Sequence, residues 1–408
     1  MADRLLVFNA RLLFRGRILP GYSLLCEDGI IRELAPDGRI QAAARRFDAG
    51  GRYLVPGYID MHIHGFKGRL VDRGPADLEA LCRELPARGV TAFLPTVTPQ
   101  PEEQRLLSEL ASVRPRGARI LGFFLEGHFL ALTGAIRGLN RDYSAARAAG
   151  LREALGNTPA IFGISPEIPG ICSLLPLMTQ TGRPAFITHT GAGFEETERA
   201  IDAGARHATH FYDVFPYPGE QEPGVRGCGA VEAILARPEV TVDFILDGEH
   251  VHPGAVRMAL ACKGPDAVCL VTDANINAGL PPGTYEGISG AGIVMNYPGG
   301  PARDRETGGL TGSGLTLDLA VKNAVKLLGL SLPEAVYLAS ANPAKVLGLE
   351  NQTGKIETGL WADFLLLDED LAVTECFIGG TQWISEDKPC LSGSLKIEAA
   401  LKMKRREP

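Results

Sequence analysis

Short apolar runs alternate with helix-like stretches through the middle of the chain. This alternation predicts a parallel sheet, and eight units of this size predict a (β/α)₈ barrel, an α/β fold. A doubly wound open sheet is the alternative, but no Gly-x-Gly-x-x-Gly follows the first run. The predicted strands are Tyr58–Ile63, Val90–Thr96, Ile120–Glu126, Ala160–Ser165, Ala185–His189, His207–Phe211, Val240–Leu246 and Val268–Thr272, and the predicted helices include Asp77–Arg88, Phe194–Ala203 and Pro253–Ala261.

The two ends of the chain have a different pattern, with short apolar runs separated by turns. Because chain termini often lie close together, we expect the two ends to form one small β domain, a β-sandwich. The predicted division is therefore residues 1–54 and 349–408 for the β part and residues 55–348 for the barrel. The strands expected there include Leu5–Phe8, Ser23–Cys26, Ile30–Leu34, Gly354–Ile356, Ala362–Asp368 and Val373–Ile378.

Composition narrows the choice of partners. The 408 residues are 45% hydrophobic and 22% charged, with a net charge of −7 and no long basic run. We therefore expect a small molecule as the partner rather than nucleic acid. No run of about 18 apolar residues and no cleavable leader is present, so no membrane association is expected. Eight cysteines without a Cys-x-x-Cys pair fit reduced thiols in the cytoplasm.

All eight histidines lie in the barrel region, and nearly all sit at or just past the end of a predicted strand. In a barrel these strand ends converge on one mouth. His62 and His64 alternate along one strand, so both imidazoles can approach one metal. His189 and His210 end two later strands. Surface or core histidines are the alternative, but the convergence of several strand ends favours a metal site.

Two carboxylates end predicted strands in the same way. Glu126 follows a run of apolar residues, where burial is costly unless a metal or an arginine is its partner. No lysine lies between Lys67 and Lys263, so strands two to seven cannot supply a carboxylated lysine, and Glu126 is the best bridge between two metals. Asp273 can take a proton from a metal-activated water and pass it to the leaving group, although an N-cap or a structural ion pair is also open.

The sequence predicts the roles of the other histidines less specifically. His250 follows the seventh strand and can donate a hydrogen bond to a substrate carbonyl or a developing oxyanion. His252 precedes a proline and is expected in a loop. His207 opens the sixth strand and is expected to be structural. For His128, a partner of a metal ligand and a substrate contact are both open.

These residues lie in familiar motifs. Residues 56–65, Pro-Gly-Tyr-Ile-Asp-Met-His-Ile-His-Gly, resemble the first-strand signature of the amidohydrolase superfamily. Further segments, in consistent order along nearly the whole chain, resemble the N-acetylglucosamine-6-phosphate deacetylases. They are Leu125–Gly127, Thr209–Asp213, Glu222–Gly224, Asp247–Val251, Leu270–Ala274, Ser313–Leu317 and Gly354–Asp363.

The resemblance implies a barrel flanked by a small β-sandwich from both termini, often in a homodimer. It implies the removal of acetate from an N-acetylated amino-sugar phosphate. By position, the principal metal ligands would be Glu126, His189 and His210, a second metal would be held by His62 and His64, the acid/base would be Asp273 and the carbonyl-orienting residue would be His250. The cofactor is one or two divalent ions, with zinc preferred and iron, nickel or manganese as alternatives.

The chain departs from the family pattern where phosphate is expected to bind. Gln221 stands where the family has an arginine, and Gly134–Arg137 lacks the usual histidine. Losing an arginine removes the best bidentate phosphate ligand, although Arg137 or Arg226 can compensate from one residue away. Asp213 and His128 replace a usual asparagine and proline. By position, the expected substrate contacts are Asp213, Val214, Gln221, Arg226, Ala135, Arg137, Thr311 and Ser313.

The sequence therefore predicts a metal-dependent amidohydrolase that converts N-acetylglucosamine 6-phosphate to glucosamine 6-phosphate and acetate. An enzyme acting on another N-acyl compound, either an unphosphorylated amino sugar or an N-acyl amino acid, is the alternative. D-aminoacylase-like, dihydroorotase-like and deaminase enzymes are rivals of the same fold. A sugar-binding protein without turnover is a further alternative, but such a protein would not need Asp273.

Overall fold

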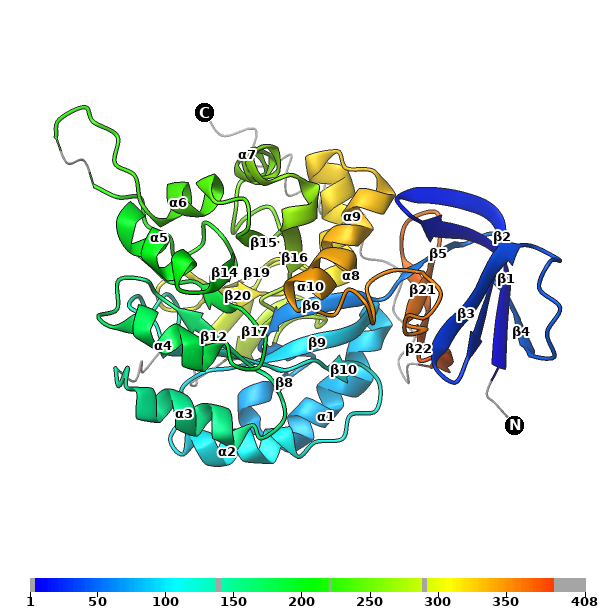
Figure 1. Ribbon diagram of the computed structural model, residues 1–408, viewed down its shortest axis with the longest axis horizontal. Coiled ribbons are helices and arrows are strands. Elements are labelled where there is room, and N and C mark those ends of the chain that lie inside the picture. The colour runs from blue at the N-terminus through cyan, green and yellow to red at the C-terminus, as the bar shows by residue number, and fades with distance from the viewer. Residues whose placement is uncertain (1–3, 137–140, 220–221, 288–291, 385–408) are drawn as a thin grey trace.

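The computed structural model describes residues 4–136, 141–219, 222–287 and 292–384. A barrel wrapped by helices makes up the larger part of the molecule, and a smaller β part lies beside it (Figure 1). The first strands of the chain and its last strands meet in the β part, as their blue and orange colours show (Figure 1).

Eight parallel strands form the barrel. Consecutive strands pair in chain order, and the ring closes where Ile63 bridges Ala274 in parallel and the Asp273 amide donates to the His62 carbonyl at 2.9 Å. The sixth strand was predicted to end at Phe211, but it ends at Ala208. His210 therefore lies in the turn beyond the strand. The barrel strands are β6 (Tyr58–Ile63), β9 (Val90–Val97), β11 (Phe123–Phe129), β12 (Ala160–Ile164), β13 (Ala185–Ile187), β14 (Ala205–Ala208), β15 (Thr241–Ile245) and β16 (Val268–Val271).

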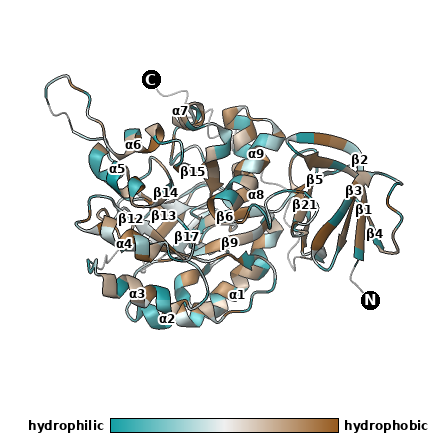
Figure 2. Ribbon diagram, viewed as in Figure 1, coloured by the Kyte–Doolittle hydropathy of each residue, from teal (hydrophilic) through white to brown (hydrophobic). Residues whose placement is uncertain are grey.

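Helices cover the outside of the barrel because each has one apolar face. In α5 the buried positions include Ala200 and Ile201, whereas Glu195 and Glu196 occupy its first turn. Figure 2 shows hydrophilic residues on outer helices such as α2 and hydrophobic residues on strands such as β9. The α-helices are α1 (Pro75–Glu84), α2 (Glu103–Ala111), α3 (Ala145–Ala154), α4 (Ile171–Met178), α5 (Phe194–Asp202), α6 (Ala230–Ala236), α7 (Pro253–Lys263), α8 (Leu317–Asn323), α9 (Leu332–Leu338) and α10 (Ala341–Val346).

Short single turns of helix connect some of these elements. They are the 3₁₀ segments η1 (Val71–Arg73), η2 (Leu85–Arg88) and η3 (Pro265–Ala267) and the π-helical segment η5 (Ala324–Leu328).

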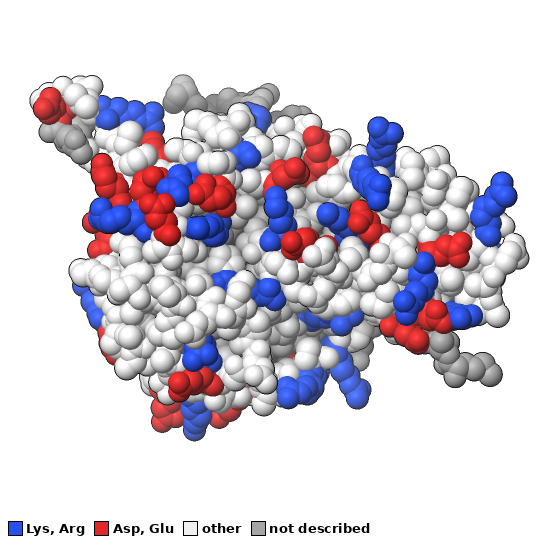
Figure 3. Space-filling view, in the orientation of Figure 1, with Lys and Arg blue, Asp and Glu red and all other residues white. Residues whose placement is uncertain are grey.

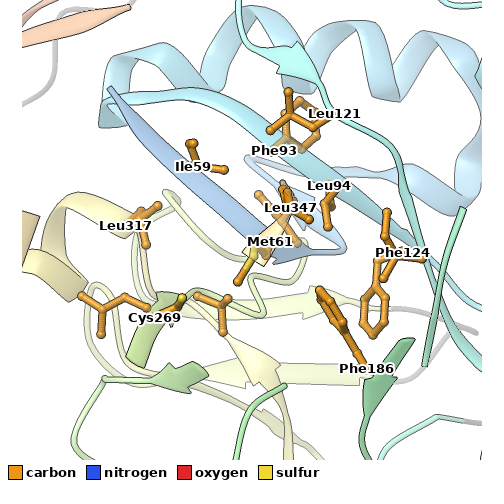
Figure 4. Close-up of a cluster of buried hydrophobic side chains, with 14 of the residues drawn as sticks. Ile59, Met61, Phe93, Leu94, Leu121, Phe124, Phe186, Cys269, Leu317 and Leu347 are labelled. Carbon is orange, nitrogen blue, oxygen red and sulfur yellow. The ribbon is translucent and has the colours of Figure 1, made fainter. Parts of the chain in front are cut away.

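Large side chains fill the barrel beneath its mouth (Figure 4). The rings of Phe124 and Phe186, on β11 and β13, have centroids 5.4 Å apart. Phe124 also packs edge-on against the His62 imidazole, with centroids 4.9 Å apart. Since all these side chains are buried, the floor under the histidines is apolar and rigid.

The β part is one sheet built from both ends of the chain. Its central pairing joins β5 to β21 antiparallel, with Tyr53 opposite Leu367. Residues Gly354–Ile356, predicted as a strand, are not one. The division at residues 54/55 and 348/349 stays a proposal. The strands are β1 (Arg4–Phe14), β2 (Arg17–Glu27), β3 (Ile30–Pro36), β4 (Arg45–Asp48), β5 (Tyr53–Pro56), β21 (Phe364–Leu367), β22 (Val373–Ile378) and β23 (Thr381–Trp383).

An antiparallel four-stranded sheet follows the eighth barrel strand, and the sequence pattern did not predict it. Thr311 and Ser313, two of the expected substrate contacts, lie in its last strand, β20. We call this sheet the arm; it consists of β17 (Gly283–Glu286), β18 (Gly292–Met295), β19 (Pro301–Asp304) and β20 (Leu310–Ser313). Three shorter strands complete the fold: β7 (Gly65–Phe66), β8 (Arg69–Leu70) and β10 (Arg119–Ile120).

The surface carries charges of both signs. On the face shown in Figure 3, acidic and basic side chains are interspersed. Among the described residues, the helices are too short or too polar to cross a membrane.

Candidate active site

Four imidazoles and one carboxylate converge at the carboxyl ends of the barrel strands. Glu126 Oε2 lies 3.3 Å from His62 Nε2 and 3.0 Å from His64 Nε2. Its other oxygen, Oε1, lies 3.4 Å from His189 Nε2 and 3.1 Å from His210 Nε2. The carboxylate therefore stands between two pairs of histidines, with one oxygen facing each pair.

Asp273 joins the first of these pairs. Its Oδ1 lies 3.4 Å from His62 Nε2 and 3.3 Å from His64 Nε2. Its side chain is 11% exposed, which leaves one edge open toward the mouth. The second pair, His189 and His210, has no such aspartate within the same distance among the described ion pairs.

The arrangement fits a divalent metal. Ligand atoms of His62, Glu126 and His210 lie within 4.8 Å of one another, as do those of His62, His64 and Asp273. The Nδ1 atoms of His64, His189 and His210 are buried without a hydrogen-bond partner among the described residues. Imidazole and carboxylate are ligands of zinc, iron, nickel and manganese.

Several site residues have left-handed backbone conformations. The φ angles are +48° for His189, +33° for His210, +46° for Asp273 and +54° for Val214. Such conformations cost of order 1 to 3 kcal/mol each and cluster at functional sites. Here backbone hydrogen bonds fix them: Thr190 donates to the Val214 carbonyl at 3.1 Å, for example. The turns thus aim the side chains into the mouth.

Histidines set the charge state of the two carboxylates. Burial alone would raise the pKa of Glu126, but His62, His189 and His210 outweigh it and hold that pKa well below the usual range. Burial is likewise opposed at Asp273, where His62 and His64 lower the pKa of the carboxyl. Both carboxylates are therefore ionised at neutral pH.

A buried hydrogen-bond network supports two of these histidines, His62 and His210. His62 Nδ1 lies 3.1 Å from the Thr209 hydroxyl, which donates to Asp243 Oδ1 at 3.1 Å. Asp243 also accepts from the His210 amide and lies 2.8 Å from His207 Nε2. Asp243 was not predicted as a site residue, although it is a single carboxylate inside an apolar strand. His207, expected to be structural, packs inside the barrel in this network.

His128 also lies inside the structure rather than in the open mouth. It is fully buried, its Nδ1 lies 3.2 Å from the Glu126 carbonyl, and its Nε2 lies 3.4 Å from Glu103 Oε2. Arg147 donates to the His128 carbonyl at 2.7 Å and binds Glu103 through both carboxylate oxygens. Burial lowers the pKa of His128 to about 4. These contacts favour a supporting role behind Glu126.

His250 lies at the edge of a hollow beside the second pair of histidines. The hollow is lined by His210, Phe211, Asp213, Ile245, His250 and Val251. The His250 ring is buried, with its Nε2 unpartnered among the described residues. Asp247, whose role the sequence analysis did not foresee, binds the opposite nitrogen, Nδ1, at 2.7 Å.

The segments predicted to contact substrate surround the site unevenly. A Cβ on Gly134 would lie 2.6 Å from His189 Cε1, so the segment that includes Ala135 crosses directly over this ligand. Asp213 and Val214 directly follow the His210 turn and are half-buried. Arg226 is 70% exposed and pairs with Glu232 at 2.8 Å.

The four other predicted contacts are Ser313, Thr311, Arg137 and Gln221. Ser313 is fully buried, and its hydroxyl donates to the Thr272 carbonyl while accepting from the Leu315 amide, so it supports the turn at Asp273. Thr311 is half-buried in β20. Arg137 and Gln221 lie outside the described residues. All of these substrate contacts stay predictions.

Comparison with known proteins matches this geometry to a family. Residues 266–387 match the amidohydrolase family. The chain is 32% identical over 381 residues to N-acetylgalactosamine-6-phosphate deacetylase of Escherichia coli O157:H7, covering 91% of this chain and 97% of that relative. The chain belongs to this family of amino-sugar-phosphate deacetylases. The predicted family and the hydrolytic class of enzyme are thus confirmed.

Solved structures of the deacetylase family share the whole architecture. The N-acetylglucosamine-6-phosphate deacetylase of Pasteurella multocida superposes with a TM-score of 0.84 at 25% identity, over 93% of this chain and 99% of that chain. That of Mycobacterium smegmatis superposes with a TM-score of 0.82 at 30% identity, over 93% and 100%. The predicted (β/α)₈ barrel with a β domain from both termini is confirmed.

Proposed function

We propose that this deacetylase hydrolyses the N-acetyl amide of a hexosamine 6-phosphate, with N-acetylglucosamine 6-phosphate as the first candidate and acetate as a product. The observation that carries the proposal is Glu126 between two pairs of histidines, with Asp273 beside one pair. Membership of a deacetylase family supports it. The homodimer and the cytoplasmic location expected from the sequence stay proposals.

The metal ligands proposed are Glu126, His189 and His210 for one ion and His62 and His64 for a second, with zinc preferred. When bound, the ion supplies Lewis-acid chemistry, polarising the amide carbonyl and acidifying water. Glu126 suits a bridging role because each of its oxygens faces a different pair of histidines.

Asp273 is the proposed acid/base. Its ionised carboxylate accepts a proton from the attacking water and returns it to the amide nitrogen as that nitrogen leaves as an amine. The pKa of Asp273, lowered by His62 and His64, keeps the group in the accepting form at neutral pH. His250 contributes a hydrogen bond to the acyl oxygen.

An unphosphorylated amino sugar is the second candidate. Arg226, one of two arginines expected to replace the missing phosphate ligand, is largely exposed and already bound to Glu232. Asp213, by contrast, places a carboxylate in the hollow beside His250.

The test is acetate release by zinc-loaded protein from three substrates: N-acetylglucosamine 6-phosphate, N-acetylgalactosamine 6-phosphate and N-acetylglucosamine. We expect a kcat/KM at least about tenfold higher for a phosphorylated sugar, which corresponds to about 1.4 kcal/mol of transition-state stabilisation. A preference for the unphosphorylated sugar would establish the second candidate. No release from any of the three would refute the amino-sugar assignment.

A further inference from the structure

The loop after β15 binds one of its own histidines through an aspartate. Asp247 Oδ2 lies 2.7 Å from His250 Nδ1, and Asp247 Oδ1 accepts the backbone amides of Glu249 and His250 at 2.8 and 2.9 Å. Both side chains are almost completely buried, with exposures of 0% for Asp247 and 1% for His250. This carboxylate therefore fixes both the loop and the orientation of the ring.

The other nitrogen of the ring is free to bind a substrate atom. His250 Nε2 is buried without a partner among the described residues, and His250 shares the lining of its hollow with His210 and Asp213. Since Nδ1 faces a carboxylate, Nδ1 carries a proton. A neutral ring would then have a lone pair at Nε2, which would repel an acyl oxygen, whereas an imidazolium donates from both nitrogens.

We propose that Asp247 is a positioning residue that holds His250 as an imidazolium, so that Nε2–H donates to the acyl oxygen of the substrate. This inference rests on the proposed deacetylase function. It gives the two groups separate tasks: His250 keeps its proton and stabilises charge on oxygen, while Asp273 moves the proton.

The charges around His250 favour the cation. Asp247 contacts it directly, and the carboxylates of Asp213 and Asp273 act on it from the turns after β14 and β16. His210, which faces the same hollow, is itself close to Glu126. Burial opposes the charge, but these carboxylates together raise the pKa of His250 above its ordinary value, and His250 in turn helps to lower that of Asp247.

The arm holds the same loop from outside. Glu249 accepts hydrogen bonds at 2.7 Å from the Tyr297 hydroxyl and at 2.7 Å from an Arg303 guanidinium nitrogen. Because Arg303 pairs with Glu249, the negative charge of Glu249 offsets the effect of the Arg303 charge on His250. The Asp247–His250 segment is therefore held from within by Asp247 and from the arm through Glu249, which restricts the movement of the His250 ring.

The protonation state can be measured without substrate. Long-range ¹H–¹⁵N spectra of zinc-loaded protein would follow the ring nitrogens of His250, assigned by the signal lost in His250→Gln. We expect both nitrogens to be protonated at pH 7. In Asp247→Asn the pKa of His250 should fall, because the carboxylate in contact with the ring is lost. Asp266→Asn makes the same chemical change at an exposed site and should change nothing.

The pH profile tests the consequence for turnover. A raised folded-state pKa means that the imidazolium is present at low pH and lost as pH rises, so the alkaline limb of kcat/KM should move to lower pH in Asp247→Asn. Asp247→Glu, which keeps the charge, should recover part of that shift. His250→Ala should lower kcat by about 10² to 10³ because it removes the donor itself.

Three results would overturn the proposal. One is a neutral His250 at pH 7 in the unmodified protein, which decides the matter even if Asp247→Asn does not fold. The others are an unchanged His250 titration and an unchanged alkaline limb in a folded Asp247→Asn protein. If the unmodified protein releases no acetate from any sugar, the proposed function fails, and the spectra still decide the state of His250.

Discussion

Replacing Asp273 by asparagine is the sharpest test of the proposed chemistry. The backbone at this residue does not depend on its carboxylate, because the amide donates to the His62 carbonyl at 2.9 Å and the carbonyl accepts from the Ser313 amide at 2.8 Å. The amide side chain of asparagine has nearly the same shape. The substitution therefore removes a charge and a proton acceptor while leaving the left-handed turn in place.

The expected loss follows from what is removed. A positioned acid/base contributes about 10² to 10⁴ to the rate, or roughly 3 to 5 kcal/mol of barrier. We expect kcat for acetate release by Asp273→Asn to fall by that factor, with KM changing far less. The melting temperature should stay within about 4 °C of the unmodified value, since the backbone bonds and the packing remain.

The assay combines steady-state acetate release, zinc per chain by mass spectrometry and thermal unfolding. Asp266→Asn serves as the matched control on the exposed surface. Because Asp273 lies 3.3 to 3.4 Å from His62 and His64, zinc content separates a lost ligand from a lost acid/base. A folded variant with full zinc content and kcat within tenfold of the unmodified protein would refute the acid/base role.

Three further predictions test the metal site, the network beneath it and the packing of the barrel. Glu126→Gln should lower zinc affinity by at least about a hundredfold, measured by chelator competition, and stoichiometric tight zinc would contradict the bridging role. Asp243→Ala leaves its buried hydrogen-bond donors unpaired and should lower the free energy of unfolding in urea by about 3 to 5 kcal/mol; a loss below about 1 kcal/mol would show that the network is dispensable. Gly57→Ala places a Cβ 2.1 Å from Thr91 Oγ1 and should cost about 1 to 3 kcal/mol in the same assay, whereas Gly219→Ala, with open space around it, should cost little.

The pattern of apolar runs was enough to predict the barrel and the convergence of its ligands. Parallel barrel strands end at one mouth, so side chains at strand ends must meet there, and His62, His64, Glu126 and Asp273 do so. The bridging role of Glu126 stays a prediction; it was drawn from the cost of burying a carboxylate in an apolar strand and from the absence of a lysine in strands two to seven. These predictions depended only on local periodicity and on the geometry common to all such barrels.

Tertiary structure decided what local periodicity does not encode. The arm consists of strands of only four residues without clear alternation, so its existence depends on antiparallel pairing and on packing against Leu70 and Ile276. Gly354–Ile356 has the composition of a strand but finds no pairing partner, whereas β21 pairs with β5, some three hundred residues earlier.

The contacts that support the site residues were also decided by the tertiary structure. The bond from Thr209 to Asp243 and the two bonds from the arm to Glu249 join residues more than thirty positions apart. The sequence alone determined which chemical groups reach the mouth, because strand register dictates it. Which partner holds each group, and therefore its charge and its aim, was decided only when the barrel closed and the arm packed beside it.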